Sequence, residues 1–174
     1  AGHYLVWKYS NELLDRKVLA VSIMPTENYL GVNVLEEVNN FVGTGHIEYY
    51  IHEIACYLGG RIAEKKYTNT YSSGAYSDLE KSTRIARNVV TRFGLSEKLY
   101  QNRVYIEDTK NPVFNEEMIS QINKEVDSIM EKAYNHAEKC IDDHLEQLEM
   151  LVKALLEKGI LSENDLEKLF SDKK

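Results

Sequence analysis

Between residues 115 and 158, apolar side chains return every three or four residues, and this run constrains the fold more than any other feature of the chain. Neither of the chain's two prolines lies within it, so the backbone is free to form continuous helix. The spacing predicts one long helix, or two helices joined by a bend, ended by Gly159. We expect its apolar stripe to be largely buried, either within the domain or against a neighbouring subunit, including Met118, Ile122, Val126, Ile129, Ala133, Leu145, Leu148 and Val152.

Three further segments carry the spacing of helices. Residues 1–17 are the first, residues 47–58 are the second and are followed by Gly59-Gly60, and residues 79–93 are the third and are followed by Gly94. Glycine directly after an apolar periodic run is a typical helix end, so we expect the second and third helices to stop at these glycines.

The chain also predicts a small β-hairpin and a last short helix. Residues 18–25 and 30–36 are short, rich in β-branched side chains and separated by polar residues, which favours two paired strands. The last helix is expected to begin at Ser162, with the Ser162 hydroxyl as N-cap and Asp165 three residues further on. The predicted fold class is therefore mainly α (α+β), with a small β-hairpin.

The bulk composition fits one compact domain. A length of 174 residues with 43% hydrophobic residues is enough for a core, and a net charge of −7 argues against a general nucleic-acid binder. Cys56 and Cys140 lie far apart in helix-like segments, so we expect both to be reduced thiols of an intracellular protein. No apolar run approaches the roughly 18 residues of a membrane span, and no signal peptide is visible.

Four short segments carry a resemblance to a known family. They are Ala1-Gly2-His3, GGRIAE at residues 59–64, SSGAYSD at residues 72–78 and RIARNVVTRFGLSE at residues 84–97. Taken in order, they resemble the protease domain of the FtsH-type ATP-dependent membrane zinc proteases, most specifically in the middle third of the chain. The resemblance covers almost the whole chain. It implies a single peptidase domain over residues 1–174, in which residues 115–174 form the C-terminal helical part.

The resemblance implies that Ala1-Gly2-His3 is the end of a His-Glu-Ala-Gly-His zinc motif, so that the domain is truncated at its N-terminus. Two histidines four residues apart on a helix can reach one zinc ion, and the intervening Glu acts as general base. We therefore expect His3 to be a zinc ligand and expect no catalytic residue within this chain, since the first His and the base lie just before Ala1. Without the resemblance, His3 is only a histidine at a helix start or the remnant of a tag.

The family takes its third zinc ligand from an acidic residue in a Ser/Thr-Gly-Ala-x-x-Asp segment. Residues 73–78 match this segment, which implies Asp78 as the ligand. One carboxylate and two imidazoles leave zinc an open position for water, as hydrolysis requires. Asp78 also suits the N-cap of a helix that begins at Leu79, and the resemblance favours the ligand over this structural role.

Two other groups have spacings that suit a metal. Residues 52–56 read His-Glu-Ile-Ala-Cys, which is the nearest approach to a complete zinc motif but has Cys56 in place of the second His. His136, Cys140 and His144 recur every four residues and share a helix face. Both groups lie on apolar stripes, where packing is the more frequent role. We therefore assign the metal to His3, Asp78 and an upstream His.

The expected function is that of a zinc-dependent endopeptidase acting on unfolded or membrane proteins, with zinc as its cofactor. Gly59-Gly60, Arg61 and Glu64 are expected to be architectural: the glycines let backbones approach, and the charged pair forms contacts near the zinc helix or between subunits. The strand with Val32 and Val34 suits an edge that pairs with extended substrate, although an ordinary hairpin strand fits equally well. The alternative function is a catalytically inactive helical assembly module of the same fold.

The resemblance also carries expectations about the longer protein. The chain contains no P-loop sequence, so ATP enters only through an ATPase module absent from this chain. The family assembles as a ring of six subunits that receives protein substrates, which implies a homo-oligomer with no nucleic-acid partner. We expect a location in the cytoplasm or at the cytoplasmic face of a membrane, with the membrane reached only through an upstream anchor.

Overall fold

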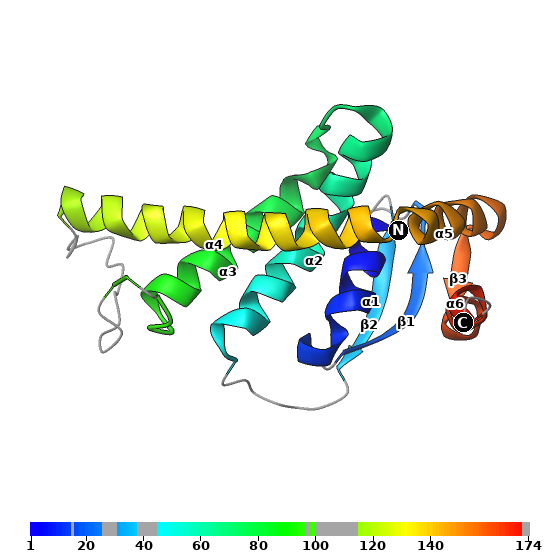
Figure 1. Ribbon diagram of the computed structural model, residues 1–174, viewed down its shortest axis with the longest axis horizontal. Helices are drawn as coiled ribbons and strands as arrows, with labels where there is room; N and C mark the ends of the chain where they lie inside the picture. The colour runs from blue at the N-terminus through cyan, green and yellow to red at the C-terminus, as the bar shows by residue number, and fades with distance from the viewer. Residues whose placement is uncertain (15, 26–30, 38–44, 97, 100–114, 172–174) are drawn as a thin grey trace.

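The computed structural model describes residues 1–14, 16–25, 31–37, 45–96, 98–99 and 115–171. Helices dominate this part of the chain (Figure 1): α1 (Gly2–Leu14), α2 (Ile47–Thr68), α3 (Tyr76–Thr91), α4 (Glu116–Asp143), α5 (Leu145–Lys158) and α6 (Glu163–Ser171). A short 3-10 turn, η1 (Ser73–Ala75), directly precedes α3. Three strands, β1 (Arg16–Ser22), β2 (Val32–Glu37) and β3 (Ile160–Ser162), form one sheet. The predicted fold class, mainly α with a small β element, is confirmed.

The long C-terminal apolar run folds as two helices with a bend at His144. α4 spans 28 residues and forms the long axis of the molecule (Figure 1). The helical hydrogen-bond pattern is interrupted at His144, whose φ of −131° and ψ of 32° are not helical. The expected burial holds for Ile122, Val126, Ile129, Ala133 and Leu148, while Met118 and Val152 are half-buried. Leu145 is 41% exposed because the stripe changes direction after the bend, so it is not buried within the domain, and its burial against a neighbouring subunit stays a prediction.

α1 and α2 pack closely where their glycines meet. The predicted helix end at Gly59-Gly60 is wrong, because α2 continues through both glycines to Thr68. A Cβ atom on Gly59 would lie 2.8 Å from the Gly2 carbonyl oxygen, and one on Gly2 would overlap the Gly59 carbonyl. These glycines therefore serve the close approach of two backbones, as expected, but they do not end the helix.

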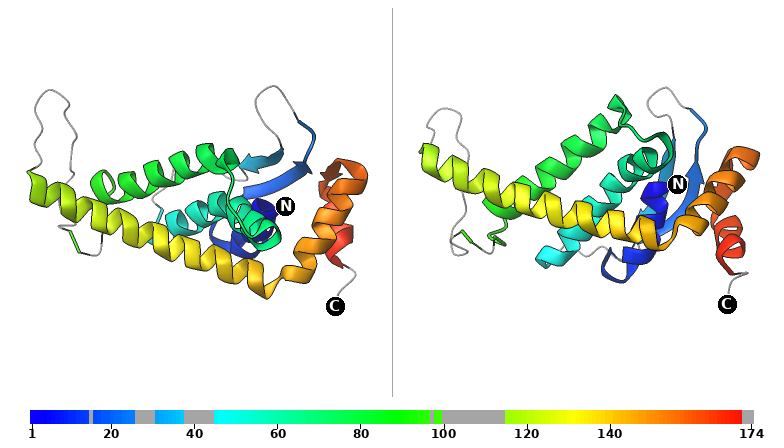
Figure 2. Two further views of the ribbon diagram at one scale, coloured as in Figure 1. Left: turned by 90° about the horizontal axis from the view of Figure 1, so that it is seen from above. Right: turned by 45° about the horizontal axis from the view of Figure 1, so that its top comes forward.

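The predicted hairpin is present, and a third strand extends it. β1 and β2 are antiparallel, with Val21 opposite Asn33. On its other side β1 pairs with β3, where Val21 lies opposite Leu161. The sheet lies at the end of the molecule that holds α5 and α6 (Figure 2), and its strand order β2-β1-β3 makes β2 an edge strand among the described strands. β3 was not predicted, since three residues after Gly159 are too few to form a recognisable pattern.

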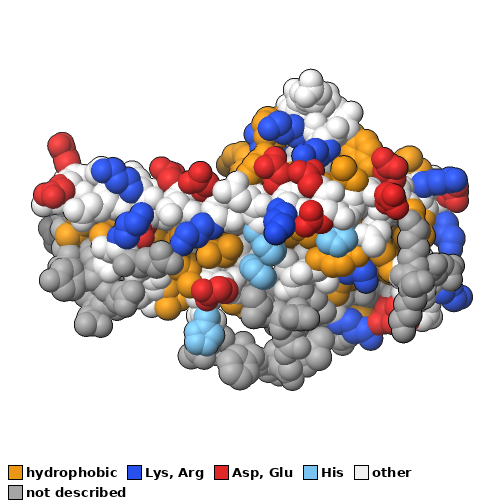
Figure 3. Space-filling model, in the orientation of Figure 1, with side chains coloured by type: hydrophobic (Ala, Val, Ile, Leu, Met, Phe, Trp, Pro, Cys, Tyr) orange, Lys and Arg blue, Asp and Glu red, His pale blue; other side chains and the backbone are white. Residues whose placement is uncertain are grey.

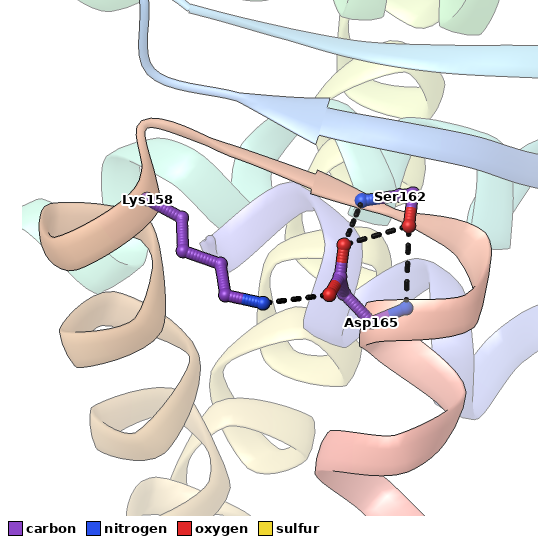
Figure 4. Close-up of polar contacts among 3 residues, drawn as sticks. All are labelled: Lys158, Ser162 and Asp165. Atoms are coloured by element: carbon purple, nitrogen blue, oxygen red, sulfur yellow. Dashed lines mark hydrogen bonds and ion pairs between the residues drawn. The ribbon is translucent and has the colours of Figure 1, made fainter.

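The start of α6 carries the predicted capping interaction (Figure 4). The Ser162 hydroxyl accepts a hydrogen bond from the Asp165 backbone N–H at 3.3 Å, and the Asp165 carboxylate accepts one from the Ser162 backbone N–H at 3.0 Å. The same carboxylate lies 2.7 Å from the ammonium of Lys158 at the end of α5. The hydrogen bonds from Lys158 and Ser162 hold the pKa of Asp165 well below its usual range. This cluster fixes the angle at which α6 leaves β3.

Two groups of buried side chains hold the domain together, and α1 contributes to both. Leu5 and Val6 of α1 join the first core, which packs α2, α3 and α4 together. Tyr4 joins the second core, in which β1, β3, α5 and α6 meet around Val21 and Leu161. Neighbouring residues of α1 are therefore buried on opposite sides. The helix that carries His3 is held in place by both halves of the fold.

The face seen in Figure 3 is covered by charged side chains of both signs along α4 and α5. This is the appearance of a solvated helix surface. Within the described ranges, no helix combines the length and the apolarity needed to cross a membrane.

Candidate active site

His3 and Asp78, the two predicted zinc ligands, come together at the junction of α1 and α3. His3 lies in the first turn of α1, and Asp78 lies in the first turn of α3. The Nε2 atom of His3 is 3.5 Å from the Oδ2 atom of Asp78. The side chains are 37% and 25% exposed, so both can be reached from solvent while being held by their helices.

The orientation of the His3 ring leaves its Nε2 atom available for a cation. Its Nδ1 atom lies 2.8 Å from the backbone carbonyl oxygen of Cys56. Because a carbonyl oxygen only accepts hydrogen bonds, Nδ1 carries the proton, and Nε2 of the neutral ring keeps a lone pair directed toward Asp78. Burial lowers the pKa of His3, an effect opposed by the Cys56 hydrogen bond and by the Asp78 charge. A neutral ring fixed through its second nitrogen is the form in which histidine binds metals.

Gly60 makes room for this imidazole. A Cβ atom at position 60 would overlap Nε2 of His3 and would lie 2.9 Å from its Cδ2 atom. The ring therefore packs directly on the backbone of α2. The pair Gly59-Gly60 thus has two separate tasks: Gly59 admits the α1 backbone, and Gly60 admits the candidate ligand.

Asp78 is not the N-cap of its helix. The alternative expectation placed the helix start at Leu79, but α3 begins at Tyr76 and follows Ala75 without a side-chain cap. Asp78 therefore lies inside the first turn, where a carboxylate interacts favourably with the helix dipole. Its Oδ2 atom faces Nε2 of His3, which places the carboxylate where it can act as a ligand.

Arg61 and Glu64 of α2 fix the loop that leads to Asp78. The Arg61 guanidinium lies 3.9 Å above the ring of Tyr71 and donates a long hydrogen bond of 3.5 Å to the Ser72 carbonyl oxygen. The Glu64 carboxylate accepts a hydrogen bond of 3.3 Å from the Ser72 backbone N–H. Hydrogen bonds from Ser72 lower the pKa of Glu64. These contacts agree with the architectural role expected for both residues, since they hold the segment before η1 against α2.

A cleft of about 720 Å³ opens beside the ligand pair. Residues of α1, α2, α3 and α5 line it, together with the end of β1, Gly31 and Asn33. Asn33 belongs to the edge strand β2 and lies between the two expected substrate-strand residues. Val34 is 42% exposed, and the Val32 side chain lies outside the described part. The candidate ligands therefore face an opening that an exposed strand edge borders.

The other two metal-like groups are directed into helix packing. The His136 ring stacks on His52 with 4.2 Å between centroids, and its Nε2 atom is 2.9 Å from the Ser10 hydroxyl. His144 lies 2.8 Å from the Cys140 carbonyl oxygen through its Nδ1 atom and stacks on the ring of Tyr9. Within the described ranges, no group of three or more His, Cys, Asp or Glu residues converges as a metal site.

Lys81, Tyr57 and Trp7 also line the cleft, and the sequence did not single them out. Lys81 follows Asp78 by three residues, so it lies on the same face of α3. Tyr57 follows Cys56 in α2, and Trp7 follows His3 by four residues in α1. The signal that could have found Lys81 and Trp7 is this helical spacing from the two candidate ligands.

An imidazole and a carboxylate that converge at a cleft are two of the ligand types that catalytic zinc sites use, so this pair points to the class of metallohydrolases. Comparison with known families gives the particular relationship: the profile of peptidase family M41 matches residues 1–169. The chain therefore belongs to peptidase family M41. The resemblance to FtsH-type proteases that the sequence motifs carried is confirmed.

Two relatives show the extent of the similarity. The ATP-dependent zinc metalloprotease FtsH 1 of Thermoanaerobacter sp. (strain X514) is 33% identical over 186 aligned positions, which cover 98% of this chain and 29% of that protein. The ATP-dependent zinc metalloprotease FtsH of Caldicellulosiruptor bescii is 36% identical over 130 positions, which cover 68% of this chain and 21% of that protein. The chain thus spans less than a third of the length of these relatives.

Proposed function

We propose that this chain is the zinc-dependent endopeptidase domain of an FtsH-like protease. The observation that carries the proposal is the approach of His3 Nε2 to Asp78 Oδ2 at the side of the cleft, 3.5 Å apart. Two electron-pair donors that face each other at this distance favour a cation between them. Membership of peptidase family M41 supports the same conclusion.

The donor set fits zinc. An imidazole nitrogen and a carboxylate oxygen are both common zinc ligands in catalytic sites. The Leu5 backbone N–H donates to the Ala1 carbonyl oxygen at 3.0 Å, so the helical geometry of α1 includes Ala1. A histidine four residues before His3 in a continued helix would face the same point, and we place the remaining ligand and the general-base Glu there. Bound zinc would supply a Lewis acid and a water of lowered pKa for peptide hydrolysis.

In this proposal, the residues of this chain hold the zinc ion and orient the substrate. His3 binds through Nε2 while the Cys56 carbonyl oxygen fixes its ring, and Asp78 supplies the carboxylate. The edge of β2, the strand that includes Val32 and Val34, offers backbone groups to which an extended substrate can pair. Pairing of this kind recognises the backbone groups of the substrate through hydrogen bonds, which suits unfolded protein substrates of varied sequence.

The longer protein supplies the other parts of the proposed activity. The relatives are named ATP-dependent zinc metalloproteases, and the chain covers 29% or less of the two described above. We propose that ATP acts through an ATPase module outside this chain, that the protein is a homo-oligomer, and that an upstream anchor brings it to the cytoplasmic face of a membrane. The alternative, an inactive assembly module, is not favoured, because assembly alone gives no reason for His3 and Asp78 to converge.

Hydrolysis of casein by two forms of the protein tests the proposal. The 174-residue chain should be folded but inactive, with weak zinc affinity, because a ligand and the base are assigned to residues before Ala1. A longer form that includes those residues should contain zinc and hydrolyse casein, and a chelator should abolish the activity. Chelator-sensitive hydrolysis by the 174-residue chain would contradict the position assigned to the base. A longer form that binds no zinc and hydrolyses nothing would support the assembly module instead.

A further inference from the structure

The cleft contains a lysine that the proposed chemistry does not use. Lys81 of α3 is half-buried and lines the same cleft as His3 and Asp78. Its Nζ atom lies 5.6 Å from the centroid of the Tyr57 ring, which also lines the cleft. A lysine ammonium near the face of an aromatic ring is attracted to it, so Tyr57 holds the side chain of Lys81 along the cleft wall.

The other charged side chains of the cleft already have partners. The Arg61 guanidinium stacks on Tyr71, Glu64 accepts a hydrogen bond from the Ser72 backbone N–H, and Asp78 faces His3. Glu53, the remaining carboxylate of the lining, also has an interaction partner. In contrast, none of the ion pairs formed among the described residues includes Lys81. Among the described residues, Lys81 therefore presents a positive charge on the cleft wall that no carboxylate neutralises in an ion pair.

Lys81 lies beside the candidate metal site, because it lines the same cleft as His3 and belongs to the same helix as Asp78. Lys81 is one helical turn beyond Asp78, and the Cβ atoms of residues three apart on a helix are about 5–6 Å from each other. Lys81 therefore leaves α3 on the same face as Asp78 and is displaced from it along the helix by about one turn.

We propose that Lys81 is a specificity-determining residue that binds a carboxylate of the substrate, at a position next to the peptide bond to be cleaved. The carboxylate belongs either to an Asp or Glu side chain or to the C-terminus of the substrate, because both present the same group to an ammonium. The displacement along α3 separates this role from stabilisation of the reacting carbonyl oxygen. The inference rests on the proposed function, since it assigns the cleft to peptides.

Peptide binding to the 174-residue chain tests the inference without zinc or hydrolysis. Trp7 is the chain's single tryptophan and lines the cleft, so its fluorescence reports an occupied cleft. Three short peptides serve as probes: an amidated peptide with one Glu, the same peptide with Gln, and the Gln peptide with a free C-terminal carboxylate. Lys81→Gln keeps most of the side-chain stem but removes the charge. Lys124→Gln, on the exposed surface of α4, is the matched control.

The unaltered protein should bind at least one of the carboxylate peptides about twofold to fivefold more tightly than the amidated Gln peptide, a preference that weakens at high salt. The Glu peptide and the free C-terminus show which source is recognised. Lys81→Gln should lose the preference, Lys81→Glu should reverse it, and Lys124→Gln should retain it. Thermal unfolding confirms that each variant is folded.

Equal affinity for all three peptides, a preference that survives in Lys81→Gln, or the lack of any binding would each overturn the inference. A uniform loss of affinity for every peptide in Lys81→Gln would also overturn it, since that result indicates a general structural role. Zinc content and casein hydrolysis of the longer form report on the proposed function separately. An active longer form with no carboxylate preference would therefore refute only the role of Lys81.

Discussion

Gly60→Ala should separate the stability of the fold from the geometry of the candidate zinc site. Gly60 lies inside α2, where alanine is favoured over glycine by about 0.5–1 kcal/mol. The nearest atoms that a new Cβ would meet all belong to the imidazole of His3, a side chain that can rotate away. The helix should therefore keep its gain in stability while His3 loses its position opposite Asp78.

Gly59→Ala is the matched control, because the adjacent glycine meets backbone instead. A Cβ at position 59 would lie 2.8 Å from the Gly2 carbonyl oxygen and 2.9 Å from Cγ2 of Val6. The backbone of α1 cannot rotate aside, so the two helices must separate. Such overpacking costs about 1–3 kcal/mol, which exceeds the gain in helix propensity of about 0.5–1 kcal/mol.

Thermal unfolding of the 174-residue chain and zinc analysis of the longer form decide between the two effects. In proteins of this size, a change of about 1 kcal/mol in the free energy of unfolding shifts the Tm by roughly 2–4 °C. Gly60→Ala should therefore raise the Tm by about 1–4 °C, and Gly59→Ala should lower it. Zinc affinity should fall by at least about tenfold in Gly60→Ala, which is the effect of losing the contacts that orient a metal-binding side chain. Full zinc retention by Gly60→Ala, or an equal loss of stability in both variants, would refute the reasoning.

Three other perturbations have defined outcomes. In the longer form, Asp78→Asn should lower zinc content and activity together. The free energy of unfolding measured without zinc should change by no more than about 1 kcal/mol, because the interactions of Asp78 with the helix dipole and with the partly exposed His3 are both weak. Leu148→Ala should cost about 2–5 kcal/mol in denaturant unfolding because the side chain is fully buried, whereas Leu145→Ala at its exposed position should cost about 0.5 kcal/mol or less. Burial lowers the pKa of both His52 and His136, so the unfolded chain binds protons more tightly there. Stability should thus be greatest above pH 6.5 and fall as the pH decreases below it, and His136→Gln should flatten this decrease in unfolding measured against pH.

Helical periodicity and side-chain caps, which depend on neighbouring residues, could be predicted from the sequence. The stripe around Ile129 is buried, and Ser162 and Asp165 cap α6 as expected. Features set by distant residues could not be predicted. Glycine after an apolar run is a typical helix end, and only the position of α1 shows that Gly59 serves a backbone contact. The exposure of Leu145 depends in the same way on a bend that its own spacing does not reveal.

In the candidate site, too, local patterns could be predicted from the sequence and contacts between distant residues could not. His3 and Asp78 were expected from motifs, and the structure brings them together, but their roles as zinc ligands remain a prediction. The alternative role of Asp78 as N-cap failed because two residues before it already adopt helical geometry. Lys81 was overlooked because a lysine on an amphipathic helix is usually a solvated residue. Its placement in a cleft depends on the packing of α2 against α3, which no local pattern contains.

The pairing of β1 with β3 sets an order of events during synthesis. Val21 and Leu161 are partners in the sheet although most of the chain separates them. The contacts of His3 with Cys56 and Asp78 involve residues made much earlier, so the candidate ligands can meet while the C-terminal half is still being translated. The sheet cannot be completed until residues 160–162 have left the ribosome. In the interval, the apolar surface of Tyr4 and Val21 has no α5 or β3 to cover it, and the nascent domain is then most exposed to aggregation and degradation.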